Sequence, residues 1–129
     1  MKTLLTISTL VFTVMFSSTS FAEWTKVDNS TDGGITVYVD FDRIRKVDGF
    51  IYWWVLIDLL KPDEDGDLSH KVYFQGDCKL FRIKTLSEVY YKQPLGGGTS
   101  ITNTPKNPEW RYPPPNSLME PVVKTVCSR

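Results

Sequence analysis

The most apolar stretch outside the first twenty residues runs from residue 50 to residue 60 and reads FIYWWVLIDLL. Its aromatic and β-branched residues are typical of a β-strand. Successive side chains of a strand point to opposite faces, and both alternate sets are apolar here, so the pattern predicts a central strand that is covered on both faces. At about 3.3 Å per residue this strand would reach about 36 Å, which is longer than most strands, so we also expect a bend or a bulge within it.

Alternating apolar and polar residues predict further strands on both sides, at residues 24–28, 35–40, 45–47, 69–80 and 82–91. A helical turn is expected at residues 41–44, and a shift in the alternation predicts a turn or bulge near residues 79–81. The acidic segment at residues 61–67 contains Pro62, which cannot donate to a strand ladder, so it closes the central strand. Three long segments joined by short turns predict an antiparallel meander.

The C-terminal third divides into a loop and a helix. Residues 93–108 are poor in apolar side chains and contain three consecutive glycines, so they are predicted to be a flexible loop. Ser117 and Glu120 match a capping box, and Pro121 indicates that the regular helix begins there. The helix should present one apolar face, which is formed by Met119, Val122, Val123 and Val126. The expected fold is therefore α+β, with a small antiparallel sheet of about five to six strands and a C-terminal helix packed on it.

The first 22 residues predict a secretory signal peptide. Lys2 is followed by an apolar stretch from Leu4 to Phe16 and then by a small-residue cleavage site that ends at Ala22. The apolar stretch is shorter than the about 20 residues that span a bilayer. Cleavage after Ala22 would leave one domain, residues 23–129, whose first residue is Glu23 and not the cysteine that would carry a lipid. We expect an exported protein, periplasmic or secreted to the cell surface, that is not a lipoprotein.

Charge excludes two classes of partner. Without Lys2, the 15 basic side chains of the chain become 14 against 15 acidic ones, which is a formal charge of −1. A charge this close to zero offers no electrostatic attraction to nucleic acid or to an anionic membrane. We therefore expect no nucleic-acid partner. No stretch of residues 23–129 is apolar over a length that could cross a bilayer, so we also expect no membrane span after signal cleavage.

Two cysteines, Cys78 and Cys127, remain in the expected mature chain. An even number of cysteines in an exported domain indicates a disulfide, which would fasten the helix to the strand that bears Cys78. Two free thiols, or one metal ligand from each cysteine, are the alternatives. A zinc site of ordinary composition cannot be assembled from these residues, because the chain has a single histidine.

Short motifs follow one another in a recognisable order along the expected mature chain. They are Trp24, Tyr38-Val-Asp40, Ile44-Arg45, the segment from Trp54 to Asp58, Ser69-x-Lys71, Asp77-Cys78, Phe81-Arg-Ile, Trp110 before Pro-Pro-Asn-Ser117, and the helix that ends in Cys127. In this order they resemble the surface-adhesin protein E-like family of bacterial exported proteins, over nearly the whole mature chain. The resemblance implies a small antiparallel sheet with a C-terminal helix and one disulfide. It also implies a surface or periplasmic location and, as in the named adhesins, binding of host matrix and plasma proteins.

No pattern in the sequence points to catalysis or to a metal. Ser69 and His70 are adjacent on a predicted strand and would point to opposite faces, so they cannot form a nucleophile–base pair. The acidic residues 63–67 fail the calcium-loop pattern, because Lys61 stands at its first position and Val72 at its closing glutamate position. We predict no catalytic residue, no metal site and no cofactor.

The aromatic residues are the remaining candidates for function. Tyr52, Trp54, Trp110 and Tyr112 are candidate interface residues, since aromatic side chains are enriched in cores and protein interfaces. One short helix cannot cover both faces of the central strand, so the face that bears Tyr52 and Trp54 should be left for a loop or a partner. Our leading hypothesis is a non-enzymatic exported binding module for a protein partner or for a second copy of itself. The alternative is a periplasmic accessory, inhibitor or assembly protein that recognises an envelope partner.

Overall fold

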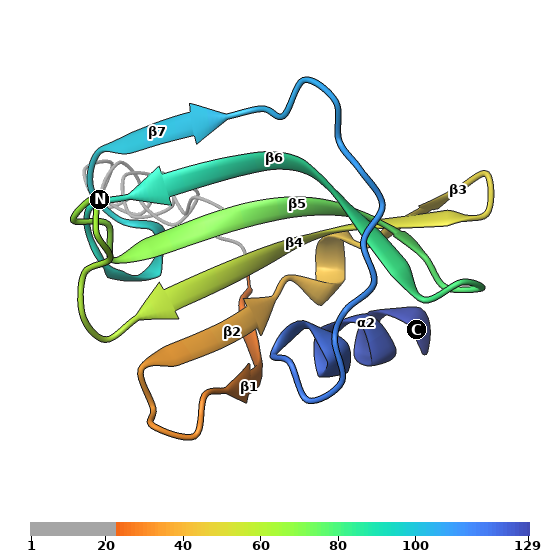
Figure 1. Ribbon diagram of the computed structural model, residues 1–129, viewed down its shortest axis with the longest axis horizontal. Helices are drawn as coiled ribbons and strands as arrows, with labels where there is room; N and C mark the ends of the chain where they lie inside the picture. The colour runs from red at the N-terminus through yellow and green to blue at the C-terminus, as the bar shows by residue number, and fades with distance from the viewer. Residues whose placement is uncertain (1–22) are drawn as a thin grey trace, which may run out of the picture.

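One antiparallel sheet and one C-terminal helix make up the fold of residues 23–129, which are the residues that the computed structural model describes (Figure 1). The predicted signal peptide, residues 1–22, lies outside them. The strands are β1 Thr25–Asn29, β2 Ile35–Val39, β3 Arg45–Val47, β4 Phe50–Leu59, β5 Ser69–Asp77, β6 Arg82–Tyr91 and β7 Ser100–Asn103. The helix α2 spans Met119–Cys127, and the short 3₁₀ turns η1 and η2 span Phe41–Arg43 and Pro94–Gly96. The predicted α+β class is confirmed.

The strand β4 is the centre of the sheet, as its sequence predicts. The strand order is β1-β2-β4-β5-β6-β7, and β3 shares one edge of β4 with β2. The predicted meander is confirmed, and β3 folds back on β4 as an additional short strand. The bulge expected in the central strand is absent, because β4 pairs with β5 without interruption from Ile51 to Asp58. Irregular pairing occurs instead within β1 and between β5 and β6.

The helix α2 and one face of the sheet enclose the core. The fully buried side chains of this core are Val37, Val39, Trp53, Val55, Phe74, Val122, Val123 and Val126. The three valines of α2 therefore form the apolar stripe that the sequence predicts, and Met119 packs beside them. Removal of this apolar surface from water is the main favourable contribution to docking of the helix on the sheet.

The helix begins earlier than expected and without the predicted capping box. Leu118 occupies the N-cap position and makes no side-chain cap bond, and the helix starts at Met119. The Ser117 hydroxyl donates instead to the carbonyl of Pro114, at 2.7 Å, because the proline turn brings that acceptor close. Pro121 fits in the first turn because the first N–H groups of a helix have no acceptor within it.

The segment after β6 is more regular than the predicted flexible loop. It contains η2 and then β7, which pairs with β6 from Tyr91↔Ser100 to Glu88↔Asn103. Gly96 and Gly98 adopt φ values of +76° and +77°, which glycine accepts without strain and which reverse the chain between the two strands. All residues of β7 are exposed, so backbone pairing rather than burial holds this strand at the edge of the sheet.

A disulfide joins the end of β5 to the end of α2, which confirms the predicted pairing. Cys78 and Cys127 are bonded, with their Cα atoms 5.7 Å apart. The free-thiol and metal-ligand alternatives are thereby excluded. Beside Cys78, burial would raise the pKa of the Asp77 carboxyl, but the hydrogen bond from Arg82 Nε at 2.9 Å and those from two backbone N–H groups outweigh it and lower the pKa. These bonds hold the turn that the sequence predicts between β5 and β6.

Candidate binding face

The helix covers one face of the sheet, and a row of aromatic side chains lies on the other. The aromatic face, as we name it, consists of Phe50, Tyr52, Trp54, Tyr73 and Trp110. Trp54 and Tyr73 are direct cross-strand partners whose ring centroids are 4.8 Å apart, and the Tyr52 and Tyr73 rings are 6.2 Å apart. All five side chains are half-buried, because they pack on one another on the face opposite α2. Aromatic pairs of this kind stabilise a sheet while they keep part of each ring accessible.

Trp110 extends the aromatic face from a distant part of the chain. Its ring stacks on Phe50 with centroids 5.7 Å apart, and the charged groups of Arg82 and Lys84 lie 4.4 Å from its centroid. Two backbone hydrogen bonds of 2.9 Å between Arg111 and Ile83 hold the segment against β6. The structure thus brings three of the four predicted interface residues to one face.

Tyr112, the fourth predicted interface residue, lies apart from the aromatic face. It is 62% exposed and borders a separate hollow together with Pro113, Pro114 and Met119. That the four residues belong to an interface stays a prediction, and Tyr112 would have to act there independently of the others.

The segment 93–98 covers one end of the second face. The Leu95 N–H donates to Asp58 at 2.8 Å, and the Ser69 hydroxyl donates to the Gln93 carbonyl at 2.7 Å. The loop contacts this end of β4 and β5, and Leu56 of β4 is fully buried. The second face therefore has a covered end at Leu56 and an open end at the aromatic face.

An open pocket of about 270 Å³ lies between these two ends. Its lining residues are Trp24, Asp40, Arg43, Trp54, Lys71, Val89 and Tyr91. They come from the residue before β1, the η1 turn with the residue before it, and the strands β4, β5 and β6, so residues far apart in the sequence meet here. Of them, sequence reasoning selected only Trp54 as a candidate. No local pattern marks the others, because the sheet topology alone brings them together.

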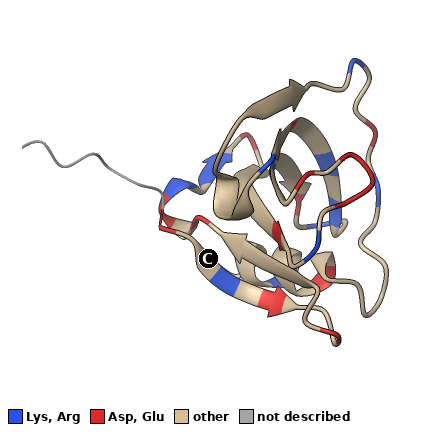
Figure 2. Ribbon diagram, turned by 90° about the vertical axis from the view of Figure 1, so that its left-hand side faces the viewer, with Lys and Arg blue, Asp and Glu red and all other residues tan. Residues whose placement is uncertain are grey.

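Charged residues form small groups of both signs, and no large area of one sign is present on the ribbon of residues 23–129 (Figure 2). This distribution agrees with the nearly neutral composition of the chain. The charges that a ligand would meet are therefore set by the few residues around each site, such as those that line the pocket.

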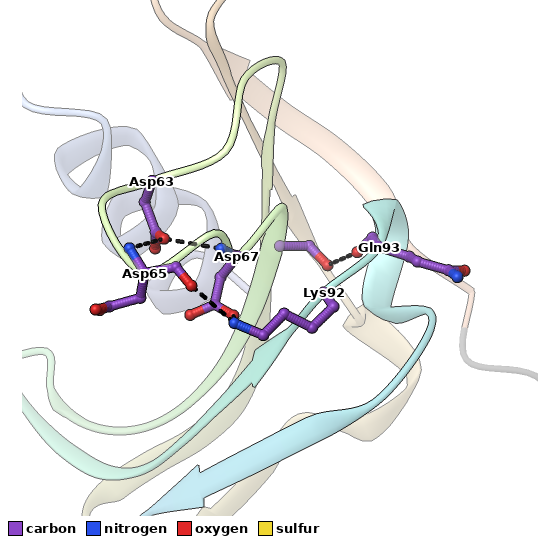
Figure 3. Close-up of polar contacts among 6 residues, drawn as sticks. Asp63, Asp65, Asp67, Lys92 and Gln93 are labelled. Carbon is purple, nitrogen blue, oxygen red and sulfur yellow. Dashed lines mark hydrogen bonds and ion pairs between the residues drawn. The ribbon is translucent and has the colours of Figure 1, made fainter.

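Three aspartates gather in the turn between β4 and β5 (Figure 3). One oxygen atom from each of Asp63, Asp65 and Asp67 lies within 4.8 Å of the others. Asp63 accepts hydrogen bonds from the backbone N–H groups of the other two, at 3.0 and 2.9 Å. The ammonium of Lys92 lies 2.9 Å from the Asp67 carboxylate and donates to the Asp65 carbonyl at 2.8 Å. A cationic side chain thus already balances charge in this turn.

Calcium is expected to leave the melting temperature unchanged. The turn lacks the liganding pattern of a calcium loop, and Lys92 is an internal counter-ion that calcium would have to displace. Thermal unfolding in millimolar calcium and in excess chelator tests this prediction. A rise of several degrees with calcium that the Asp65→Ala variant abolishes would contradict it.

Ser69 and His70 lie on opposite faces of β5, as predicted. Ser69 is fully buried under the 93–98 loop, whereas the His70 ring packs at a tilt against Tyr90 with centroids 5.2 Å apart. Burial and the carboxylate of Glu88, which accepts from the phenol at 3.0 Å, raise the pKa of Tyr90 to about 12. The Tyr90 phenol is therefore neutral at physiological pH. Because Ser69 and His70 point to opposite faces of β5, they form no nucleophile–base pair.

Comparison with known protein families identifies the family of this chain. The family model described as surface-adhesin protein E matches residues 24–128. The chain belongs to the surface-adhesin protein E family. The family is one of surface adhesins, which suggests an exported, protein-binding molecule. Within residues 23–129, no helix has the length and apolar character needed to cross a membrane.

Solved structures of protein E from Haemophilus influenzae share the fold of this surface-adhesin protein E family member. Crystal form II is 12% identical, with a TM-score of 0.58, over 87% of this chain and 91% of that chain. A second structure is 15% identical, with a TM-score of 0.54, over 81% and 93% of the two chains. Protein E from non-typeable H. influenzae is 14% identical, with a TM-score of 0.53, over 82% and 84%. A comparison with curated proteins gave no match.

Proposed function

We propose that the protein is an exported binding module that recognises a protein partner through its aromatic face and carries out no catalysis. The observation that carries this proposal is the position of five half-buried aromatic side chains on the sheet face opposite α2. Aromatic residues are enriched in the centres of protein interfaces, where their large rings bury much area at a small entropic cost. Membership of an adhesin family supports the same role.

Host matrix and plasma proteins are the class of partner that this family membership favours. An envelope protein of the same cell is the alternative class, which would make the protein a periplasmic accessory, inhibitor or assembly factor. A second copy of the chain is a further partner that the same face would accept. Fractionation separates these roles, because a protein found only in the periplasm cannot contact a host.

The Trp54→Glu variant is expected to lose the partner while it remains folded. A carboxylate at the centre of the aromatic face would be desolvated in a complex without a compensating partner. The substitution would also remove the ring that packs against Tyr73. The experiment is a side-by-side pull-down from host plasma and from envelope extract, with light scattering on the purified protein to detect self-association. A Tyr52→Glu variant tests the same face at a second position.

Ile101→Glu is the matched control. Ile101 is 68% exposed on β7, and it pairs with Tyr90, which places it on the opposite side of the sheet from Trp54. This variant should retain every partner. If the parent protein is monomeric at high micromolar concentration and retains no partner, the proposal fails. It also fails if both the Trp54 and Tyr52 variants keep native melting temperatures and retain the partner as the parent does.

A further inference from the structure

We propose that the pocket beside the aromatic face binds an acidic side chain of the protein partner, with Arg43 and Lys71 as the two groups that receive its carboxylate. This inference rests on the proposed function and names the chemistry of the partner at one point. The pocket is continuous with the aromatic face, because Trp54 belongs to both. Its volume of about 270 Å³ is below the range of about 300–1,000 Å³ typical of small-molecule sites, and it suits one side chain of a larger partner.

Lys71 supplies the first cationic group, and its side chain is held in place. Its ammonium lies 5.1 Å from the ring centroid of Tyr91 and 5.7 Å from that of Trp24, in cation–π contact with both. Gly96 leaves room for the stem, since a Cβ atom at this glycine would lie 2.9 Å from Lys71 Cε. The ammonium is not in an ion pair with any carboxylate of residues 23–129. Lys71 therefore offers its ammonium to the pocket without a competing carboxylate among residues 23–129.

Arg43 supplies the second cationic group, from the end of the η1 turn. Its Nε atom lies 3.4 Å from Asp40 Oδ2, and the side chain is 59% exposed. That contact leaves the outer nitrogens of the guanidinium free, because the structure gives them no acceptor among the described residues. A guanidinium with two free nitrogens has the planar geometry that binds a carboxylate through two parallel hydrogen bonds.

Asp40 lies beneath Arg43 and positions it. Its side chain is 2% exposed, and neither carboxylate oxygen has a hydrogen-bond donor within residues 23–129. The backbone N–H of Asp40 donates to the Trp54 carbonyl at 3.4 Å, which fixes the residue at the side of β4. A buried carboxylate without donors is stabilised here by the neighbouring guanidinium alone. Asp40 thus holds Arg43 at the pocket, while its own oxygens are inaccessible to a ligand.

The charge balance favours an anionic ligand over a cationic one. Two cations and one anion line the pocket, and the anion is the group that lies out of reach. A carboxylate that enters would meet both cations and the apolar surface of Trp24 and Trp54, whereas an ammonium would be repelled by Arg43 and Lys71. The occupant that fits is therefore a glutamate or aspartate next to an apolar residue.

Three blocked dipeptides test this inference on the exported protein. The probes are acetyl-Phe-Glu-amide, acetyl-Phe-Gln-amide and acetyl-Phe-Lys-amide, and the readout is the shift of the Trp24 and Trp54 indole N–H signals in an NMR titration. The glutamate probe should shift both signals and bind about tenfold more tightly than the glutamine probe, since hydrogen bonds to charged groups are the stronger ones. Its affinity should fall as salt is added.

Substitutions separate an anion site from a cation site. Arg43→Gln and Lys71→Gln should each weaken the glutamate probe about five- to tenfold, whereas Arg45→Gln should leave it unchanged. Arg45 is the matched control, because it lies over the Tyr52 ring at 5.9 Å and outside the pocket.

Several results would overturn the inference. They are tighter binding of the lysine probe, equal binding of the glutamate and glutamine probes, or no binding of any probe. None of these results would refute the proposed function, which depends on retention of a protein partner by the parent and its loss in Trp54→Glu. Conversely, a protein that binds the glutamate probe but retains no protein partner would contradict the proposed function and leave the anion site in place.

Discussion

The Cys127→Ser variant is expected to have a free energy of unfolding about 2–5 kcal/mol below that of the parent chain, the usual loss for a native disulfide in a small exported domain. The bond joins residues separated by 49 positions, and the chain-entropy model gives about 4 kcal/mol for a loop of this length. A typical domain has a total stability of about 5–15 kcal/mol, so this bond contributes a large share.

The structure gives a second reason for a large effect. The helix α2 has nine residues, whereas isolated helices shorter than about 12–15 residues are marginal in water. Its stability therefore depends on docking through Val122, Val123 and Val126, with Cys127 fastened to the sheet. Release of the last turn would expose part of the core that these valines share with Trp53.

Denaturant unfolding of the parent and the variant, each with and without reductant, measures this loss. Reductant should destabilise the parent and leave Cys127→Ser unchanged, and Cys78→Ser should behave as Cys127→Ser does. A variant that melts like the parent would contradict the prediction. Mass mapping under non-reducing conditions that shows two free thiols would contradict it as well.

Gly76→Ala is expected to destabilise the protein by about 1–3 kcal/mol or more, as overpacking of a core does. A Cβ atom at this position would lie 2.6 Å from Trp53 Cζ3, 2.9 Å from Trp53 Cη2 and 3.0 Å from Ile51 Cγ2. The Trp53 ring is fully buried and packs on Phe74 with centroids 5.6 Å apart, so it has little room to move away. Gly76 is therefore required for lack of space rather than for an unusual backbone conformation.

A double-mutant cycle with Trp53→Phe tests the physical cause. The Trp53 indole N–H has no acceptor within the described residues, so phenylalanine loses ring volume there but no hydrogen bond. If the clash is with the indole, Gly76→Ala should cost clearly less in the Trp53→Phe background than in the parent. Additive effects would show that the glycine matters for another reason. Gly34→Ala, whose Cβ would meet only the Asp32 side chain at 3.2 Å, is the comparison in an exposed turn.

Much of the fold follows from local patterns. The alternation of apolar and polar residues predicts β2, β5 and β6, and the continuous apolar run predicts β4, since burial of one or both faces of a strand leaves a direct trace in the sequence. The apolar spacing in the tail predicts α2, and two cysteines in an exported domain predict the disulfide. The predicted capping box does not form, because the Ser117 hydroxyl donates to the carbonyl of Pro114 instead. The position of that carbonyl depends on the path of the preceding proline turn.

Local sequence patterns do not predict the strand β7 or the complete aromatic face. All residues of β7 are exposed, so no apolar alternation marks it, and its pairing with β6 is made by backbone groups that every sequence has. Tyr52 and Trp54 were predictable as neighbours on one face of β4. That Trp110 would join them depends on the bridge between Ile83 and Arg111, which no local feature encodes.

The sequence by itself determined the class of fold, the central strand, the helix with its apolar stripe, and the cysteine pair, because each of these depends on spacing within a short segment or on composition. The tertiary structure alone decided which ends of the second face are covered and which groups meet at the pocket. Asp40, Lys71 and Tyr91 are separated by tens of residues and have no shared motif. The register of β2 with β4, of β4 with β5, and of β5 with β6 places them together, and register is a property of paired strands rather than of any one of them.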